Sequence, residues 1–313
     1  MDAKDVKTAV VVGAGVMGRS IAQVFAQRGI QVALVDTSDN LLDRAVALIQ
    51  SNLNTLAGFK RVARKQIPTI LSRIHPSTDL SAVAPDADFV VETVSEVAEV
   101  KRKVFVQLDE ICREDTILSS NTSSLDPFSI ADIRRPQRLI IAHWFNPAHI
   151  IPLVEVVPGP KTSSEVVELT AGLLQRLGKM PVVLEQFVPS GIINRIQNAI
   201  SFTVYEMVDK GWATPEQIDR AVKAVMGIRL PILAVCQLLD FTGLDTVNNI
   251  VAGMGIRFPL IDDMVNQGHL GVKTSRGIYD YGGRSEQEIL RKRDELYLKM
   301  LEHLERMKAF DPI

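Results

Sequence analysis

The sequence has 313 residues, more than the ~100–200 of a usual domain, so we expect two domains that each bury a core. Apolar residues make up 46% and charged residues 23%, a balance typical of a folded globular protein. A formal net charge of −2 gives no long-range attraction for nucleic acid or for an anionic membrane, so we expect neither as a partner.

The start of the chain has no apolar segment followed by a small-residue cleavage site, and no unbroken apolar run reaches the ~18 residues of a membrane helix. We therefore expect a cytoplasmic protein. The two cysteines, Cys112 and Cys236, lie far apart and form no C-x-x-C pair or Cys/His cluster. This spacing predicts neither a disulfide framework nor a metal site.

The first half alternates short β-branched runs with helical periodicity, which predicts βαβ units and a mainly parallel sheet with helices on both faces. Helices are expected over 19–29 and 40–56. Continuously apolar runs fit parallel strands, because these are buried on both sides. Strands are expected over 8–12, 31–36, 88–93, 116–120, 138–143 and 152–157.

The segment "VVGAGVMGRS" at 11–20 follows the first strand and opens a helix, and it has the spacing G-x-G-x-x-G. Gly13 allows a tight turn, Gly15 lets the backbone approach a pyrophosphate, and Gly18 lets the helix pack closely on the strand. The unpaired N–H groups of the helix N-terminus then face the phosphates. We expect this loop, including Val16 and Met17, to bind a dinucleotide.

Asp36 ends the second predicted strand, about 20 residues after the glycines, where a carboxylate accepts hydrogen bonds from the ribose hydroxyls of the cofactor. The same carboxylate repels a 2′-phosphate. The sequence therefore predicts an α/β Rossmann-type domain that binds NAD rather than NADP.

From Ile192 onward the sequence has only helical patterns, interrupted at "KGWATP", "GIRLP", "FTGLD" and "RFP". We therefore predict a Rossmann domain over 1–188 and an all-α C-terminal domain over 189–313 for substrate binding and dimerisation. From Ser285, apolar residues recur at helical spacing between charges of both signs, which predicts an amphipathic tail helix.

A second unusual stretch is "AHWFNPAHIIPLVEVV", in which His143 ends one predicted strand and Glu155 lies in the next. A return of this length can bring the two side chains together. A carboxylate then fixes the tautomer of the histidine and stabilises the imidazolium formed when an alcohol proton arrives. The pair alone fits a general base and a structural histidine equally well.

Four segments together resemble the 3-hydroxyacyl-CoA dehydrogenase family: "NTSSL" at 121–125, "HWFNP" at 143–147, "LVEVV" at 153–157 and "NR" at 194–195. The resemblance covers nearly the full chain. It implies an NAD-dependent dehydrogenase that oxidises a 3-hydroxyacyl-CoA, such as 3-hydroxybutanoyl-CoA, to the 3-oxoacyl-CoA. It also implies a catalytic site of His143, Glu155 and Asn194, with Ser123 binding substrate and cofactor.

The resemblance extends to "VSEVAEVKRKVF" and "GVKTSRGIYDY", and it implies four further residues that contact the dinucleotide. These are Glu96, Lys101, Asn146 and Lys273. Family members also commonly dimerise through the helical domain. The apolar segments "NAISFTVYEMV" and "PILAVCQLL" lead us to expect a homodimer.

The segment after the second strand, "GFKRVARKQIPTILSRI", does not align clearly with the CoA contacts of the family. Its cations Lys60, Arg61, Arg64 and Lys65 fit either a grip on CoA phosphates or a solvated helix face. In the helical domain, "GIRLPILAVCQLLDFTGLDT" replaces the usual Pro-Met-Gly-Pro-Phe segment and introduces Arg229.

Arg229 is a natural bidentate anchor for a free carboxylate, so a second hypothesis is a small hydroxy or formyl acid without CoA. Relatives that resemble this family act on gulonate, carnitine or a pyridine carboxylic acid. A third hypothesis, from another class, is a non-catalytic NADH-binding or structural protein of the crystallin type. The complete set of His143, Glu155 and Asn194 argues against this third hypothesis, because folding does not require all three.

Overall fold

The computed structural model of the chain describes residues 2–311. It contains two compact units, Met1–Ala199 and Ile200–Ile313. Their boundary lies inside a long helix, α8 (Ile193–Asp209), whose first residues belong to the first unit. The domain boundary expected at 188/189 stays a prediction.

The first unit is built on an eight-stranded sheet in the order β3-β2-β1-β4-β5-β6-β7-β8. Neighbouring strands are parallel except for the antiparallel pair β6 and β7. The strands are β1 (Thr8–Val12), β2 (Gln31–Val35), β3 (Ile74–Ser77), β4 (Phe89–Glu92), β5 (Ile117–Ser120), β6 (Leu139–Trp144), β7 (Leu153–Pro158) and β8 (Met180–Val183).

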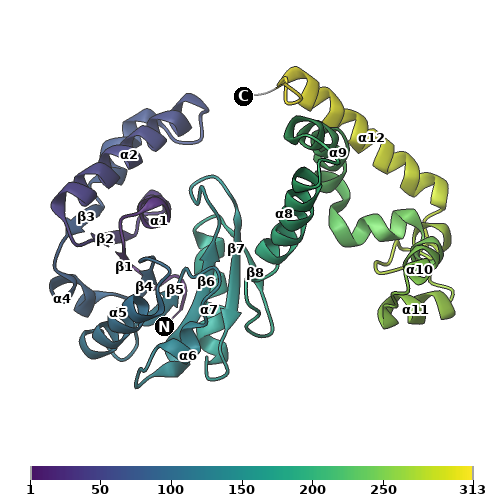
Figure 1. Ribbon diagram of the computed structural model, residues 1–313. Helices are drawn as coiled ribbons and strands as arrows, with labels where there is room; N and C mark the ends of the chain where they lie inside the picture. The colour runs from purple at the N-terminus through teal and green to yellow at the C-terminus, as the bar shows by residue number, and fades with distance from the viewer. Residues whose placement is uncertain (1, 312–313) are drawn as a thin grey trace. The chain divides into compact units, whose positions relative to one another are not determined.

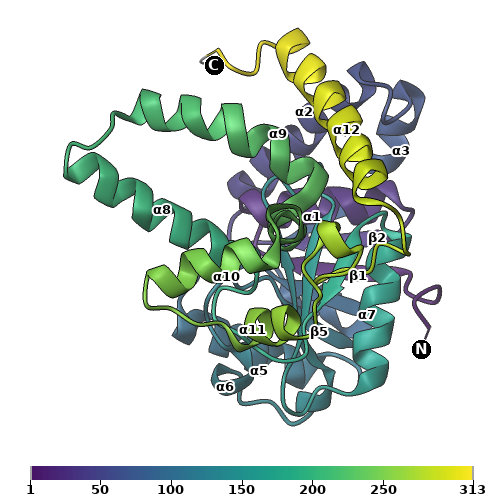
Figure 2. The same cartoon turned by 90° about the vertical axis from the view of Figure 1, so that its right-hand side faces the viewer.

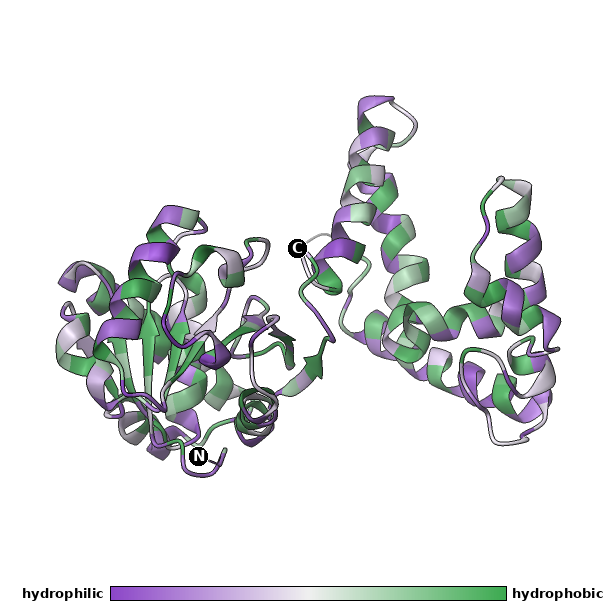
Figure 3. Ribbon diagram, turned by 90° about the horizontal axis from the view of Figure 1, so that it is seen from below, coloured by the Kyte–Doolittle hydropathy of each residue, from purple (hydrophilic) through white to green (hydrophobic). Residues whose placement is uncertain are grey.

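Helices cover both faces of this sheet, as the sequence predicts (Figure 1). One core joins α1, α2 and α7 to one face, and a second core joins α4, α5 and α6 to the other. Figure 3 shows the strands as largely apolar between more polar helices. The helices are α1 (Val16–Gln27), α2 (Asp39–Gly58), α3 (Ile67–Leu71), α4 (Leu80–Val83), α5 (Ala98–Ile111), α6 (Pro127–Ile130) and α7 (Ser164–Arg176).

The six predicted strands are confirmed, and β3 and β8 were not predicted. These two are the edges of the sheet. Strand β3 contains Pro76, which has no N–H for a strand ladder and is tolerated at an edge. Three of the four residues of β8 are exposed, so it lacks the continuous apolar burial that identifies the central strands.

The chain runs from β1 outward to β2 and β3 and then returns to place β4 on the other side of β1. This reversal is the switch point at which open α/β sheets bind ligands, outside the carboxyl ends of the strands. The predicted dinucleotide loop follows β1. The segments that follow β4, β5 and β6 carry Glu96, Ser123 and Asn146, respectively.

The second unit is helical, and its described residues include only isolated β-bridges besides helices and turns (Figure 2). The predicted tail helix is confirmed, with Ser285 and Glu288 forming a capping box, and it packs on α9. After α8, the helices are α9 (Pro215–Thr242), α10 (Leu244–Gly253), α11 (Pro259–Asn266) and α12 (Glu286–Arg306).

By length and composition, α9 is one helix within residues 2–311 that is long and apolar enough to cross a membrane. The helix is interrupted, because Pro231 lies inside it and Ala234 has a non-helical backbone. Near its end, the buried Asp240 accepts hydrogen bonds from the backbone of Ile278 and Tyr279 and from the hydroxyl of Tyr281. These contacts tie this part of α9 to the loop that precedes α12.

Candidate active site

The glycine loop between β1 and α1 has the geometry that dinucleotide binding needs. Gly13 has a φ of +103°, and a side chain at Gly18 would overlap the carbonyl oxygen of Gly13. By contrast, a Cβ at Gly15 would meet nothing within 4 Å, and Gly15 begins α1 without a side-chain cap. Open space therefore lies where the backbone must approach a pyrophosphate, beside the uncapped N–H groups of the helix.

Asp36 lies directly after β2 and points toward this loop. Its Oδ2 accepts a hydrogen bond from the backbone N–H of Ala14 at 2.7 Å, and its Oδ1 accepts from the N–H of Thr37 at 2.7 Å. The carboxylate is half-buried, so it is held at the loop while remaining accessible. This position fits a carboxylate that accepts hydrogen bonds from the ribose hydroxyls of NAD.

His143 and Glu155 are directly opposite each other in the antiparallel register of β6 and β7. Side chains at opposite positions lie on the same face of a sheet, which brings them into contact. His143 Nδ1 lies 3.0 Å from Glu155 Oε2, and both side chains are buried. The carboxylate selects the tautomer in which Nδ1 donates, which leaves Nε2 as a proton acceptor.

Nε2 of His143 faces Ser123, whose Oγ lies 3.3 Å away. Ser123 is exposed and belongs to the loop that follows β5. Beside it, the ring of Phe145 packs on the imidazole with 4.4 Å between the ring centroids. Nε2 of the buried His143 and the hydroxyl of the exposed Ser123 are thus within hydrogen-bonding distance.

Glu155 also contacts the start of α8. Its Oε1 accepts hydrogen bonds from the backbone N–H groups of Ile192 at 2.9 Å and Ile193 at 3.0 Å. The next residue is Asn194, which is half-buried in the first turn of α8. One carboxylate therefore orients His143 and anchors the helix that carries Asn194.

Burial raises the pKa of Glu155, but the hydrogen bonds from His143, Ile193 and Ile192 have the larger, opposite effect. The pKa of Glu155 therefore lies below its usual value. Glu155 is consequently an anion at neutral pH. An anion in this position stabilises a positive charge on His143.

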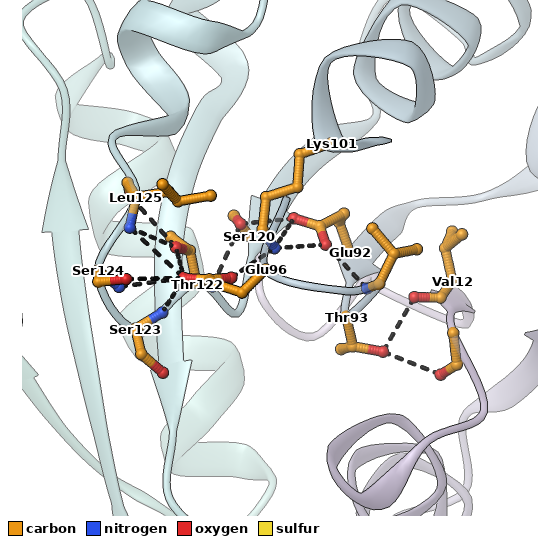
Figure 4. A network of polar contacts seen from close by, with 12 residues as sticks. Val12, Glu92, Thr93, Glu96, Lys101, Ser120, Thr122, Ser123, Ser124 and Leu125 are labelled. Atoms are coloured by element: carbon orange, nitrogen blue, oxygen red, sulfur yellow. Dashed lines mark hydrogen bonds and ion pairs between the residues drawn. The ribbon is translucent and has the colours of Figure 1, made fainter. Parts of the chain in front are cut away.

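Glu96 and Lys101, both expected to contact the dinucleotide, are joined to each other by an ion pair of 3.1 Å. Figure 4 shows Lys101 between Glu96 and Glu92, a residue that the sequence reasoning missed. The side chain of Lys101 is only 1% exposed, whereas that of Glu96 is 38% exposed. A contact of either residue with the dinucleotide stays a prediction.

Asn146 is exposed on the loop after β6, and its contact with the cofactor also stays a prediction. Sequence reasoning missed Asn121, whose Oδ1 accepts a hydrogen bond from the N–H of Trp144 at 2.9 Å. This bond ties the Ser123 loop to the end of β6. Its signal was present, because Asn121 is the first residue of the "NTSSL" segment.

Two predicted site residues belong to the second unit. Lys273 pairs with Asp245, with Nζ at 2.7 Å from Oδ1 and 2.9 Å from Oδ2. Arg229 is exposed on α9. Their roles as contacts for cofactor and substrate stay predictions. Among the described residues, no cluster of His, Cys, Asp and Glu could hold a metal ion.

A basic pocket of about 1020 Å³ lies entirely within the first unit. Six basic residues line it, and none of the described residues around it is acidic. Of the four cations singled out after α2, Arg61 and Lys65 are among these lining residues. The basic lining residues are Arg28, Arg61, Lys65, Arg73, His149 and Lys179.

The loop after His143 forms one wall of this basic pocket, and Lys179 holds that loop in place. Its buried Nζ donates to the carbonyl oxygens of Ala148 at 2.5 Å and Ile151 at 2.8 Å. Burial and the charge of Arg28 lower the pKa of Lys179 to about 8. His149, in the same loop, lies 2.7 Å from Ser20 Oγ through its Nδ1.

Two family models together match most of the chain. The family model "3-hydroxyacyl-CoA dehydrogenase, NAD binding domain" matches residues 8–187, and "3-hydroxyacyl-CoA dehydrogenase, C-terminal domain" matches residues 192–281. The chain belongs to the 3-hydroxyacyl-CoA dehydrogenase family. As a member it is an NAD-dependent dehydrogenase that acts on a CH–OH group, so the predictions of an enzyme and of NAD are confirmed.

The dehydrogenase is 37% identical over 280 residues to the probable 3-hydroxybutyryl-CoA dehydrogenase of Deinococcus radiodurans, covering 87% of this chain and 99% of the relative. It is 36% identical over 296 residues to the 3-hydroxyadipyl-CoA dehydrogenase of Escherichia coli, covering 91% of this chain but only 61% of that longer relative. A solved 3-hydroxyacyl-CoA dehydrogenase from Archaeoglobus fulgidus has a TM-score of 0.79 at 30% identity, covering 95% and 99% of the two chains.

We expect the change Asp36→Ala to reduce the preference of the dehydrogenase for NAD over NADP. The substitution removes both the acceptor for the ribose hydroxyls and the charge that repels a 2′-phosphate. The measurement is the ratio of kcat/KM values for the two cofactors. An unchanged ratio in a folded Asp36→Ala enzyme would show that Asp36 does not lie at the ribose.

Proposed function

We propose that this dehydrogenase oxidises a short-chain 3-hydroxyacyl-CoA to the 3-oxoacyl-CoA, with His143 as the general base. The observation that carries the proposal is the buried pair of His143 and Glu155, which leaves Nε2 of His143 facing the Ser123 hydroxyl. The names of the relatives from Deinococcus radiodurans and Archaeoglobus fulgidus support the substrate class.

Oxidation of a secondary alcohol removes a proton from oxygen and a hydride from carbon, and bound NAD supplies the hydride acceptor. His143 takes the hydroxyl proton at Nε2, because Nδ1 already donates to Glu155. The anionic Glu155 offsets the charge that His143 gains. In the reverse direction, His143 returns the same proton to the new alcohol.

The hydroxyl of Ser123 and the amide of Asn194 position the substrate oxygen in this proposal. Both are neutral groups held by backbone anchored in the first unit, so their dipoles are in place before the reaction begins. Ser123 is on a loop bound by Glu96, and Asn194 follows two backbone N–H groups bound by Glu155. The contribution of these residues is orientation rather than covalent chemistry.

The basic pocket supports a substrate that carries phosphate groups. Arg61 and Lys65 provide a planar guanidinium and an ammonium group, which are suited to phosphate oxygens. The pocket also borders His149 and Ile150, in the loop that follows His143. We therefore assign the phosphates of CoA to the basic pocket.

Removing the two pocket cations tests this assignment. We expect Arg61→Gln with Lys65→Gln to raise the KM for acetoacetyl-CoA by about 10–100-fold, because a hydrogen bond to a charged group contributes ~1.5–3 kcal/mol. The matched control is Lys60→Gln with Arg64→Gln, which removes the same charge from the same segment outside the pocket lining. Equal changes in KM for the two variants would overturn the phosphate assignment.

A substrate panel separates the CoA thioesters from free acids. Acetoacetyl-CoA is assayed beside the 3-oxoacyl form of 3-hydroxyadipyl-CoA, a gulonate-type sugar acid, carnitine and an aromatic formyl carboxylic acid. With a thioester substrate, Arg229→Met leaves KM almost unchanged, whereas with a carboxylate held by Arg229 it raises KM sharply. No turnover of any CoA thioester would overturn the proposed function.

We also propose that the dehydrogenase is a homodimer formed through its helical unit. Large apolar side chains are exposed on α8 and α9, among them Phe202 at 67%, Tyr205 at 62% and Val235 at 47%. Exposed apolar surface of this kind is covered by a partner in many proteins. Light scattering at micromolar concentration tests this proposal, and a monomer mass would overturn it.

A further inference from the structure

The dehydrogenase buries a charged carboxylate, Glu92, that contacts neither His143 nor Ser123. Glu92 is the last residue of β4, and its side chain is 0% exposed. Its two oxygens accept from Lys101 Nζ at 2.8 and 3.0 Å, and Oε1 also accepts from the N–H of Val94 at 2.9 Å. Buried ion pairs often add little net stability, because desolvation offsets their attraction. Stability alone is therefore a weak explanation for this pair.

One route leads from Glu92 to the Ser123 loop through Lys101. The ammonium group of Lys101 also pairs with Glu96 Oε2 at 3.1 Å. The other oxygen of Glu96 accepts hydrogen bonds from the backbone N–H groups of Ser123 at 3.0 Å, Ser124 at 3.1 Å and Leu125 at 3.4 Å. The carboxylate of Glu96 thus accepts hydrogen bonds from three successive N–H groups of the loop, and its ion pair with Lys101 holds it in place (Figure 4).

A second route runs through Ser120, the last residue of β5. Its hydroxyl donates to Glu92 Oε2 at 2.6 Å and accepts from the N–H of Thr122 at 3.3 Å. The hydroxyl of Thr122 in turn donates to Glu96 Oε1 at 2.5 Å. Both routes start at Glu92 and end on the backbone that carries Ser123.

Burial raises the pKa of Glu96, but the Thr122 hydroxyl, Lys101 and the backbone N–H of Ser124 lower it to about 2. With a pKa this low, the carboxylate of Glu96 is ionised at neutral pH. The loop is therefore held by a permanent charge whose position depends on Lys101.

We propose that Glu92 is a positioning residue for the reaction: it fixes Lys101 and Ser120, and these set the Ser123 hydroxyl opposite Nε2 of His143. The inference rests on the proposed role of Ser123 in holding the substrate oxygen. Glu92 itself touches no reacting atom, and its effect passes through Glu96 and Thr122.

The first test uses Glu92→Gln, which keeps the shape of the side chain and removes its charge. We expect faster hydrogen exchange at the backbone amides of Ser123, Ser124 and Leu125, because Lys101 loses the anion that orients it. The matched control is Asp109→Asn, which removes another buried, ion-paired carboxylate from α5, the helix that carries Lys101. It should destabilise the protein while leaving exchange at these amides unchanged. This readout does not depend on the identity of the substrate.

The second test measures turnover of acetoacetyl-CoA. We expect Glu92→Gln to lower kcat about tenfold with a smaller change in KM, since a misplacement of ~1 Å can reduce a rate up to 10²-fold. Asp109→Asn should retain kcat when assayed well below its unfolding temperature. In a Ser123→Ala background, Glu92→Gln should cause no further loss, because two residues that act as a unit are non-additive.

Unchanged amide exchange in folded Glu92→Gln, or an equal loss of kcat with and without Ser123, would overturn the positioning role. Ser123→Ala with full activity would instead overturn the role proposed for Ser123. If Glu92→Gln does not fold, Ser120→Ala removes one of the two routes and should show a smaller loss of the same kind. Full kcat and unchanged exchange in Ser120→Ala would then overturn the inference.

Discussion

Changing His143 to glutamine is expected to lower turnover by about 10²–10⁴-fold, the loss typical of removing a general base. Glutamine keeps a polar side chain opposite Glu155 but cannot accept the alcohol proton. NADH binding should stay nearly intact, because Asp36 contacts Ala14 and Thr37 at the glycine loop, whereas His143 contacts Ser123 and Glu155. The measurements are the rate of NADH absorbance change with acetoacetyl-CoA and a fluorescence titration with NADH.

The matched control is His75→Gln, since His75 is an exposed histidine on β3 that contacts Gln31. It should retain both turnover and NADH binding. His149 tests the assignment more directly, because it lies six residues from His143 and bonds with Ser20 rather than with a carboxylate. Retained activity in His143→Gln together with its loss in His149→Gln would reverse the assignment of the base.

A single methyl group at Gly191 is expected to disrupt the pair of His143 and Glu155. Gly191 has a φ of +55°, and a Cβ there would overlap Glu155 Oε2, the oxygen that contacts His143. Gly191→Ala therefore combines backbone strain of ~1–2 kcal/mol with displacement of the carboxylate. We expect a kcat lowered at least tenfold and a lower Tm, measured by steady-state kinetics and thermal unfolding.

Gly211→Ala separates the two effects, because Gly211 has a similar φ of +64° and a Cβ there would meet nothing within 4 Å. This control should lower Tm through strain alone and retain kcat. Equal kcat values for Gly191→Ala and the unchanged enzyme would show that Glu155 keeps its position, or that the position is unimportant. Either result contradicts the coupling inferred from the structure.

Local sequence determined the parts of the site that depend on neighbouring residues. Gly13, Gly15 and Gly18 predicted the loop because strand, turn and helix follow one another within a few residues. The proximity of His143 and Glu155 was also predictable, since they lie on successive strands joined by a short return. Edge strands β3 and β8 were missed because their short sequences lack the continuous apolar pattern of the buried strands.

The resemblance to the family identified Glu96 and Lys101 as candidates but not their surroundings. A lysine in a helical segment of mixed charge is expected to be exposed to solvent, but Lys101 is almost fully buried between two carboxylates. Glu92 received no role, although an acid directly after the apolar run 89–91 is a usable signal. Its partners come from α5 and β5, which only the packed sheet brings beside β4.

By itself, the sequence determined the Rossmann and helical fold classes, the NAD-binding loop and the histidine–carboxylate pair, because periodicity and short-range spacing encode these features. The tertiary structure alone decided that Glu155 also anchors the start of α8 and that Glu92 supports the Ser123 loop. Both functions depend on hydrogen bonds across more than 25 residues of sequence. Such partners are selected by which strands and helices pack together, and no local pattern of residues specifies that choice.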